Sequence, residues 1–426
     1  MSKKIIQMSL TNKKILVLYF LSLFNLVYTQ APKFNFEIIN NPKDDLYWFQ
    51  NFNNNGLIQS EFNLFTKFEL TKKNTNYHIS LISTSSEEQE FLIGETYIKH
   101  NFKKNGYLKI GRYYRNHSEY LNDELSSGHM QISHNAQPVP KIGFVKELSF
   151  YKVDLKFGIS HGQFSKDNYY HKAPLLHEKF FYVDIPQNDS SKFSIGIAHN
   201  AMWGGATPSR NYPVNIKNFL KVFVAADGFD PGTKEDGQPL HQNALGNHVG
   251  IWDFSYHKRN NEKKLTLYYQ HIFETDTGIR FSNKFDGLWG AELINYLPKT
   301  TILLEYLSTE NQLTPDNDQM ERYYYNYQYI LGWSYKNNNL GNPYIPIYKN
   351  YNDIKIINAM HFAIKGNILN NDYTIQMGRR VNFSDFINYK VILERKIKGD
   401  FSLGCFIVGN EDTNSLGFIF SKNIGL

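Results

Sequence analysis

The sequence predicts an all-β protein that crosses a membrane as one closed antiparallel β-barrel. Three observations support this prediction: segments of strand length alternate apolar and polar residues, aromatic residues make up 16% of the chain with 30 Tyr and 32 Phe, and long apolar runs are missing after residue 30. Barrels carry aromatic girdles at both membrane interfaces, whereas a helical span needs roughly 20 apolar residues. A Tyr-rich soluble sandwich would share this composition, so the alternation must separate the two folds.

The first thirty residues have the layout of a cleavable signal peptide. Four lysines precede or flank an uncharged apolar run, ILVLYFLSLFNLVYT (15–29), which is shorter than the roughly 20 residues of a membrane span. A retained anchor is the alternative, although no stop-transfer pattern follows the run. We therefore expect a signal peptide over 1–30 and a single barrel over 31–426, in which 31–59 lies in the periplasm or plugs the barrel. Met8 is a second candidate start.

Charge and cysteine content exclude several classes of partner and site. The formal net charge is +6, and residues 1–30 contain four lysines and no acidic residue, so the mature chain carries 6 − 4 = +2. No Lys/Arg-rich block occurs in the chain, which argues against nucleic acid as a partner. The one cysteine, Cys405, excludes an internal disulfide and a thiolate zinc site.

Period-two alternation identifies the membrane strands. In VDLKFGISH (153–161) the apolar residues from Val153 to Ile159 point one way, while Asp154, Lys156 and Ser160 point the other. The same pattern recurs in six further segments: GIWDFSYHK (250–258), DYTIQMGR (372–379), KFSIGIAH (192–199), TILLEYL (301–307), NYKVILERK (388–396) and SLGFIFS (415–421). Candidate strands continue from about Ser60 to the end, and the mature length accommodates about 16 to 18 of them, an even number being expected.

Some segments break the strand pattern. VNIKNFLKVFVAAD (214–227) places apolar residues at helical spacing after a capping asparagine, which predicts a short helix on the periplasmic end of the barrel or inside it. SEYLNDELSSG (118–128) is a weaker helical candidate that ends at Gly128. The Asn-rich stretches 35–59, 311–323 and 336–353 are expected to be loops or plug segments.

Catalytic and metal chemistry find little support in the motifs. His177, Glu178 and the later histidines show neither a His-x-x-x-His pair nor a His-Glu-x-x-His helix, so we expect no metal. No G-x-S-x-G occurs, and Ser160 beside His161 is the kind of neighbour pair that most long barrels offer. Two of the residues Glu178, Glu274 and Asp286 could form the carboxylate pair that cleaves a glycosidic bond, but the sequence does not give the distance between them. We expect no catalytic residues, no cofactor and no enzyme.

The best candidates for a binding site are aromatic and polar residues beside glycines in the middle of the chain. Glycines in AMWGG (201–205), ALGNHVG (244–250) and FDGLWG (285–290) mark bulges or close approaches, and their tryptophans could be interfacial anchors. The functional alternative is that the indoles stack on sugar faces while amide and carboxylate groups bond hydroxyls. The candidate site consists of Trp203, Asn247, His248, Gln270, His271, Glu274, Asp286 and Trp289.

Eight short blocks, in this order, resemble the Wzi family of capsule-assembly proteins. They are ELSSG (124–128), LHEKF (176–180), MWGG (202–205), NIKNFLKVF (215–223), NALGNHVG (243–250), YYQHIFE (268–274), RFSNKFDGLWG (280–290) and LGNP (340–343). The resemblance is greatest to Bacteroidetes-like members. It implies an 18-stranded outer-membrane barrel with short periplasmic helices, which acts as a lectin and holds capsular or surface polysaccharide at the cell.

The resemblance also implies partners and leaves alternatives. Besides the polysaccharide, the expected partners are outer-membrane lipid and the barrel assembly machinery. This machinery usually recognises an aromatic residue at the end of a barrel, but this chain ends in Leu426. Phe418 and Phe420 could supply the recognition signal instead. The main alternative function is a channel for sugars or ions, which needs an open lumen lined by charge. Its candidate lining residues are Asp154, Lys156, Glu305, Glu394 and Lys396. A membrane hydrolase is the third class, and no motif requires it.

Overall fold

The computed structural model describes residues 33–40, 49, 54–57, 62–85, 91–166, 169–208, 210–226, 244–312, 321–382, 386–397 and 400–425. The expected signal peptide, residues 1–30, lies outside this described part of the chain. None of the helices within it is long and apolar enough to cross a membrane.

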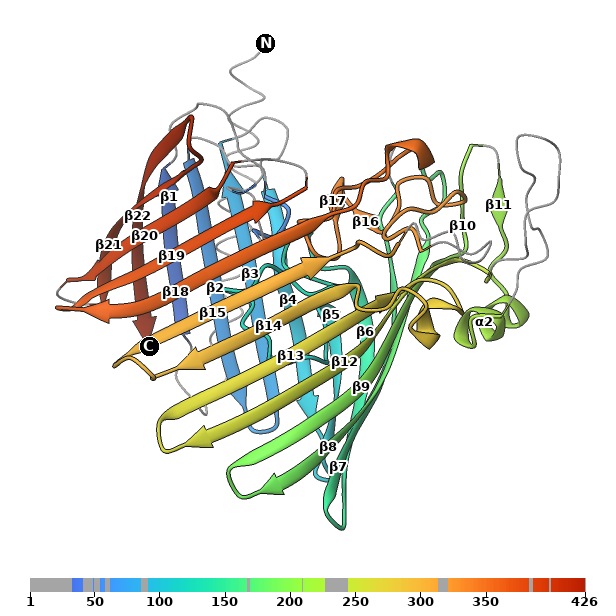
Figure 1. Ribbon diagram of the computed structural model, residues 1–426, viewed down its shortest axis with the longest axis horizontal. Helices are drawn as coiled ribbons and strands as arrows, with labels where there is room; N and C mark the ends of the chain where they lie inside the picture. Colours follow the sequence, from blue (N-terminus) through green and yellow to red (C-terminus); the bar gives the residue numbers. More distant parts are fainter. Residues whose placement is uncertain are drawn as a thin grey trace.

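Eighteen strands form one sheet, as the sequence predicted (Figure 1). They are β1 (Lys33–Asn40), β2 (Phe62–Lys72), β3 (Thr75–Thr84), β4 (Phe91–Asn101), β5 (Gly106–Arg112), β6 (Pro140–Phe150), β7 (Val153–Gln163), β8 (Leu175–Asn188), β9 (Ser191–Trp203), β12 (Asn247–Asn260), β13 (Lys263–Phe273), β14 (Gly287–Ile294), β15 (Thr300–Ser308), β18 (Asn358–Ile368), β19 (Asn371–Arg380), β20 (Asn388–Lys396), β21 (Phe401–Gly409) and β22 (Asn414–Gly425). Smaller elements are β10 (Gly205–Ala206), β11 (Asn211–Tyr212), α2 (Ile216–Phe223), η2 (Gly278–Arg280), β16 (Ser334–Tyr335), β17 (Asn338–Asn339) and η3 (Tyr351–Asp353).

The first and last strands close the barrel. β1 pairs antiparallel with β2 on one side and with β22 on the other, and Lys33 lies opposite Gly425. Closure satisfies the backbone groups that an open edge would leave unpaired in lipid. Residues 33–40 were expected to belong to a periplasmic or plug segment, and they are instead a wall strand. The apolar–polar alternation in KFNFEIIN matches that role.

The connections sort into two kinds at the two ends of the barrel. Two-residue turns join β2 to β3, β6 to β7, β8 to β9, β12 to β13 and β18 to β19, and both ends of the described chain lie at this short-turn end. Leu369 and Asn370 both have positive φ, at 50° and 66°, which suits a tight hairpin. The long connections 113–139, 204–246 and 309–357 all lie at the opposite, long-loop end. In outer-membrane barrels the short turns face the periplasm and the long loops face outward.

The two faces of the wall follow the predicted alternation. On β12, Asp253 and Ser255 point into the barrel, where Asp253 accepts hydrogen bonds from Ser118 and Tyr120 of the connection 113–139. Phe254 and Tyr256 alternate with them and point outward. The outward positions elsewhere carry exposed apolar side chains, among them Ile98, Ile110, Phe181, Leu304 and Met360. An apolar outer face and a polar inner face are what a lipid-facing barrel requires.

Two connections from the long-loop end fill the lumen. We call residues 113–139 the plug. Within it, the carbonyl of Gln131 accepts a hydrogen bond from the Trp333 indole at 2.6 Å, and the carbonyl of Gly128 accepts one from Asn342 at 2.6 Å. The largest fully buried side chains include Trp333, Tyr113 and Tyr324 from these connections. A barrel of this strand number would otherwise leave a wide lumen, so its core consists of folded-in loops.

The helical predictions met different outcomes. α2 forms within 214–227, and Asn215 caps it by accepting a hydrogen bond from the Asn218 N–H at 2.9 Å. However, α2 lies at the long-loop end (Figure 1) and against outward-facing residues of the wall, neither at the periplasmic end nor inside the barrel, the two places that we expected. Residues 118–128 form turns and no helix. Their side chains bond the barrel wall instead, as Asn122 does with Glu292 at 2.8 Å, and these tertiary contacts outweigh a weak helical propensity.

Candidate functional site

The candidate site residues do not come together in one place. Asn247 and Gln270 point into the lumen, where both are fully buried. The Gln270 side chain accepts a hydrogen bond from the Met130 N–H at 3.0 Å and donates one to the Tyr120 hydroxyl at 3.1 Å. Both partners belong to the plug, so Gln270 holds the plug to β13 and is not presented to a ligand.

Trp203 and His248 lie on the outer wall, beneath α2. The Trp203 ring packs 5.9 Å from the Phe219 ring of the helix. His248 Nε2 donates to the Leu245 carbonyl at 3.0 Å, which leaves Nδ1 to accept from His199 Nε2 at 2.9 Å. These contacts fix β9 against β12 and seat the helix. They place both residues outside the barrel, away from Gln270.

His271 and Trp289 also face outward, on β13 and β14. His271 is buried because the Phe281 ring stacks on it at 4.2 Å. Trp289 is 39% exposed and stacks on Tyr269 at 3.8 Å. Stacked aromatic residues at the end of lipid-facing strands form the interfacial girdle of a barrel. The interpretation of Trp289 as an interfacial anchor therefore fits its place better than that of a sugar ligand.

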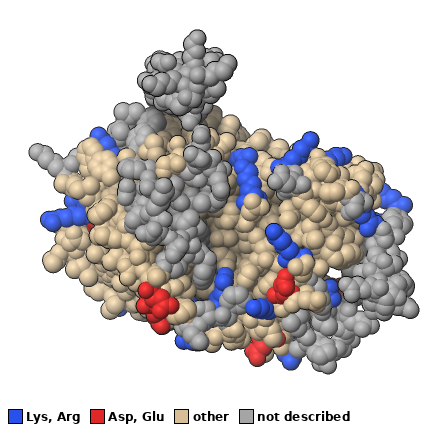
Figure 2. All heavy atoms as spheres, turned by 90° about the horizontal axis from the view of Figure 1, so that it is seen from above, with Lys and Arg blue, Asp and Glu red and all other residues tan. Residues whose placement is uncertain are grey.

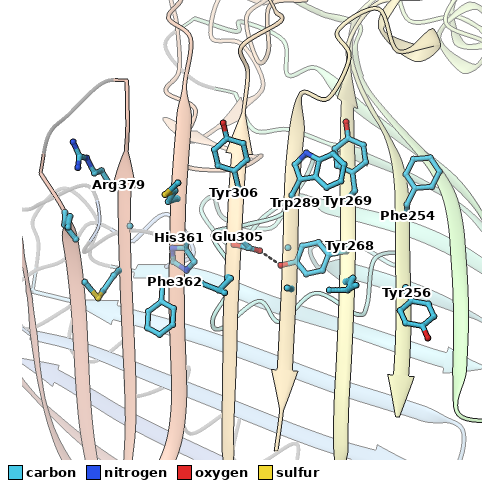
Figure 3. Close-up of a pocket in the computed structure, with 18 of the residues that line it drawn as sticks. Phe254, Tyr256, Tyr268, Tyr269, Trp289, Glu305, Tyr306, His361, Phe362 and Arg379 are labelled. Carbon is cyan, nitrogen blue, oxygen red and sulfur yellow. Dashed lines mark hydrogen bonds between the residues drawn. The ribbon is translucent and has the colours of Figure 1, made fainter. Parts of the chain in front are cut away.

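A hollow of about 1030 Å³ lies beside Trp289 on the same outer wall (Figure 3). Its lining is mainly the outward side chains of β12 to β19, such as Leu267, Leu304 and Met360. Figure 3 shows the hydrogen bond from Tyr268 to Glu305 on the inner side of these strands. The barrel wall therefore lies between the hollow and the plug. An apolar hollow in this wall faces lipid, so we do not assign the polysaccharide to it.

Glu274 and Asp286 belong to a group of buried carboxylates with Glu321 that joins two loops at the long-loop end. Glu274 accepts from the Tyr324 N–H at 2.6 Å, and Asp286 accepts from the Tyr323 hydroxyl at 2.9 Å. Burial raises the pKa of Asp286 to about 6 and that of Glu321 to about 7. Backbone N–H groups occupy oxygens of both Glu274 and Glu321. The group therefore holds the loops together through its hydrogen bonds.

Two of the charges that were expected to line an open channel are engaged by the plug. Glu305 accepts from the Ser126 hydroxyl at 2.7 Å, and Lys156 forms an ion pair with Glu119 at 2.9 Å. Also on the inner face of the wall, Lys141 and Glu178 form a buried ion pair at 2.8 Å. Within the described residues, no group of three or more His, Cys, Asp or Glu side chains could hold a metal ion.

Sequence reasoning missed a cluster of tyrosines at the long-loop end. We call Tyr169, Tyr325 and Tyr327, which are half-exposed, the tyrosine surface. Tyr169 packs on buried Tyr170 at 5.1 Å, and buried Tyr329, in the same run as Tyr325 and Tyr327, stacks on Tyr212 at 5.1 Å.

Amide groups hold this surface in shape. The Tyr212 hydroxyl donates to the Gln328 carbonyl at 3.1 Å, and the Gln328 side chain donates to the Tyr327 hydroxyl at 3.1 Å. Asn326 accepts from the N–H groups of Gln328 and Tyr329, each at 2.9 Å, and so forms a side-chain-stabilised turn. The run YYYNYQY (323–329) is the sequence signal for it. Within it Tyr alternates with Asn326 and Gln328 only from Tyr325 to Tyr329, a stretch too short to separate a strand from a loop, and the sequence predicted no element there.

On the face that Figure 2 shows, the charged groups of the described residues do not gather in one patch. Seen from above, Lys and Arg side chains of the described residues are dispersed over a mostly uncharged surface (Figure 2). This agrees with a nearly neutral mature chain and gives no basic footprint of the kind that nucleic-acid binding needs.

A closed eighteen-stranded barrel, apolar outside and filled by its own outer loops, defines a plugged outer-membrane β-barrel. The sequence model of the family described as "Capsule assembly protein Wzi" matches residues 44–349. The chain belongs to this family, and it is an outer-membrane protein.

A solved structure shares the fold. The chain is similar to Wzi from Escherichia coli, an outer-membrane protein involved in group 1 capsule assembly that is a carbohydrate-binding β-barrel, with 12% identity, a TM-score of 0.59, and coverage of 93% of this chain and 85% of that one. OpdQ of Pseudomonas aeruginosa gives 9% identity and a TM-score of 0.42, covering 93% of this chain and 97% of that chain. No curated protein sequence gives a significant match.

Proposed function

We propose that the protein binds an exported polysaccharide at its long-loop end and holds it at the cell surface as a lectin-like anchor. Its family and the carbohydrate binding of Escherichia coli Wzi support a carbohydrate ligand. The observation that carries the proposal for this chain is the tyrosine surface, which lies at the outward end of a barrel whose lumen is filled.

The tyrosine surface has the chemistry that a sugar chain needs. Tyrosine offers a large, rigid and amphipathic contact at low entropic cost, and an aromatic face can pack on the C–H face of a pyranose ring while neighbouring amides bond hydroxyls. In the sequence, Asn326 and Gln328 flank the half-exposed Tyr327, and Asn326 separates it from Tyr325. A repeating polymer can engage many copies of the protein at once, so weak single contacts are sufficient for retention.

The channel alternative is weaker because the plug bonds the wall along the lumen. Gln270, Asp253 and Glu305 each accept hydrogen bonds from plug residues. An enzyme is also less well supported, because Glu274 and Asp286, two of the carboxylates considered for glycoside cleavage, are engaged within the loops. We propose that the protein acts by binding alone.

Lipid and the barrel assembly machinery complete the proposed partners. On β22, Phe418 and Phe420 are 58% and 39% exposed and alternate with inward-facing Ile419. Lipid-facing aromatic residues on the last strand support the idea that they carry the assembly signal in place of the terminal Leu426.

Binding of surface polysaccharide to the purified, folded protein tests the function. Replacing Tyr325 and Tyr327 together by alanine should weaken binding about tenfold or more, because each lost aromatic contact costs about 1 kcal/mol. The matched control is Tyr306→Ala, a tyrosine on the lipid-facing wall, which should bind like the wild type. Unchanged binding by the double variant, with heat-modifiable gel mobility intact, would remove the tyrosine surface as the site; no binding by the wild type would remove the function.

A further inference from the structure

The helix α2 lies outside the barrel wall. On β8 and β9, His177 and Trp203 are outward-facing, since they alternate with inward residues such as Glu178 and Met202. The Phe219 ring of α2 packs 5.4 Å from His177 and 5.9 Å from Trp203. Phe223 packs 5.4 Å from His177 as well. Figure 1 shows α2 beside the long-loop end of the barrel.

A second apolar face of α2 remains uncovered. Ile216, Leu220 and Val224 are 73%, 57% and 67% exposed. At 100° per residue these three lie on one stripe, about 110° around the helix from the face formed by Phe219, Val222 and Phe223. Asn218 lies about 160° from Leu220, on the other side. The helix thus has one apolar face against the wall, a second apolar face to its side and a polar face opposite. This is the layout of an interfacial helix.

The uncovered face continues the lipid-facing wall. Below His177 along β8, Phe181 points outward and is 44% exposed, and on the neighbouring β7 the outward residue Ile159 is 40% exposed. The apolar stripe of α2 therefore adjoins strands that contact lipid along their length. Between the helix and these strands, the Lys179 ammonium lies 4.5 Å above the Phe223 ring. A cation in this position can reach the depth of the lipid headgroups.

A second segment folds over the outer wall in the same way. The Trp252 indole on β12 donates to the Ile279 carbonyl at 3.0 Å, which holds η2 against the barrel. Phe281 stacks on His271, and Phe285 is 70% exposed next to Trp289. Two separate loops thus present apolar side chains outside the barrel at the outward ends of adjoining strands.

We infer that α2 is an interfacial helix that inserts Ile216, Leu220 and Val224 among the acyl chains of the outer leaflet. The occupant is membrane lipid, because the stripe is continuous with the lipid-facing wall and lies at its outward rim. The helix would fix the loop 204–246 at the membrane surface. This inference is independent of the polysaccharide, since it depends only on the barrel and its membrane.

Site-directed fluorescence in lipid tests the inference. In a Cys405→Ser background, an environment-sensitive dye is attached at Leu220→Cys, with Asn218→Cys as the matched control on the same helix and Leu304→Cys as a control in the lipid-facing wall. Each variant is folded into vesicles with nitroxide-labelled lipids, carrying the nitroxide either near the headgroup or deep in the chain. Heat-modifiable gel mobility confirms that each barrel has folded.

We expect the dye at 220 to be quenched most by the shallow nitroxide and to be shielded from iodide in the water. The dye at 304 should be quenched by the deep nitroxide, and the dye at 218 should respond mainly to iodide. Equal iodide quenching at 220 and 218, without quenching by lipid, would overturn the inference. The inference would also fail if position 220 were shielded from iodide only after polysaccharide was added. It would fail as well if the shielding appeared only at protein concentrations that favour contact with a second copy.

Discussion

Lys141 on β6 and Glu178 on β8 form an ion pair at 2.8 Å in which both side chains are buried. Lys141 also donates to the carbonyl of Tyr114, the second residue of the plug. One ammonium group therefore links the wall to the segment that fills the lumen. The pair connects the stability of the barrel to closure of its interior.

Breaking this pair should destabilise the barrel. Glu178→Gln leaves a buried ammonium without its counter-charge, which typically costs about 3 to 5 kcal/mol. The temperature at which the folded gel band is lost should fall clearly. Glu119→Gln is the control, because the Glu119 side chain is 63% exposed in its ion pair with Lys156 and should contribute at most about 1 kcal/mol. Equal effects would mean that the buried pair is not a structural link.

The assignment of faces predicts a second contrast. Phe254→Arg places a charge on the lipid-facing side of β12 and should cost roughly 2 to 4 kcal/mol near the membrane midplane. Lys156→Gln on the inner face of β7 should be mild. The measurement is urea unfolding of the barrel in vesicles. If both variants unfold alike, the parity assigned to these strands is wrong.

The plug predicts that the wild-type protein conducts no steady current in a planar bilayer. The double variant Tyr120→Phe, Gln270→Ala removes plug–wall hydrogen bonds that are each worth about 0.5 to 1.5 kcal/mol, so we expect intermittent openings. Ser255→Ala, which changes a luminal hydroxyl that bonds His257 on its own strand, should stay closed. A large steady conductance of the wild type would favour the channel alternative.

The buried carboxylates predict a pH dependence of the outer loops. Burial raises the pKa of Glu321 from 4.5 to about 7, so between about pH 4.5 and 7 the unfolded loop loses a proton that the folded loop retains. Loop stability should therefore be full below pH 4.5 and fall as pH rises to 7, by on the order of 2 to 3 kcal/mol. Hydrogen exchange of residues 321–335 should be faster at pH 8 than at pH 5. In Glu321→Gln that difference should shrink; if it persists, another group is responsible.

The wall could be predicted from the sequence because period-two alternation is a local signal. Val153 to Ile159 and Trp252 to Tyr256 take the faces that their pattern predicted. The helix α2 also left a local signal in Asn215 and the spacing of Phe219 and Phe223. Strand content and the approximate number of strands follow from such patterns, whereas the end at which a loop helix lies does not.

The candidate site could not be predicted in the same way. Alternation predicts that Trp203 and Gln270 lie on strands. It does not predict that α2 covers Trp203 or that the plug covers Gln270. The contact of Gln270 with Met130 joins residues more than a hundred positions apart. In 323–329, Tyr alternates with Asn326 and Gln328 only from Tyr325 to Tyr329, which is too short a stretch to separate a strand from a loop. The surface follows from tertiary packing, such as that of Tyr329 against Tyr170 and Tyr212.

A mass balance of cell-bound and released polysaccharide tests the proposed anchor most directly. Strains would carry the wild type, a deletion, or the Tyr325→Ala, Tyr327→Ala variant at equal outer-membrane levels. Removing a binder lowers the bound fraction without changing synthesis. The anchor predicts that bound polymer falls and released polymer rises in the deletion and in the variant, with the total and the chain length conserved. A collapse of the total, or an unchanged bound fraction in the deletion, would contradict it.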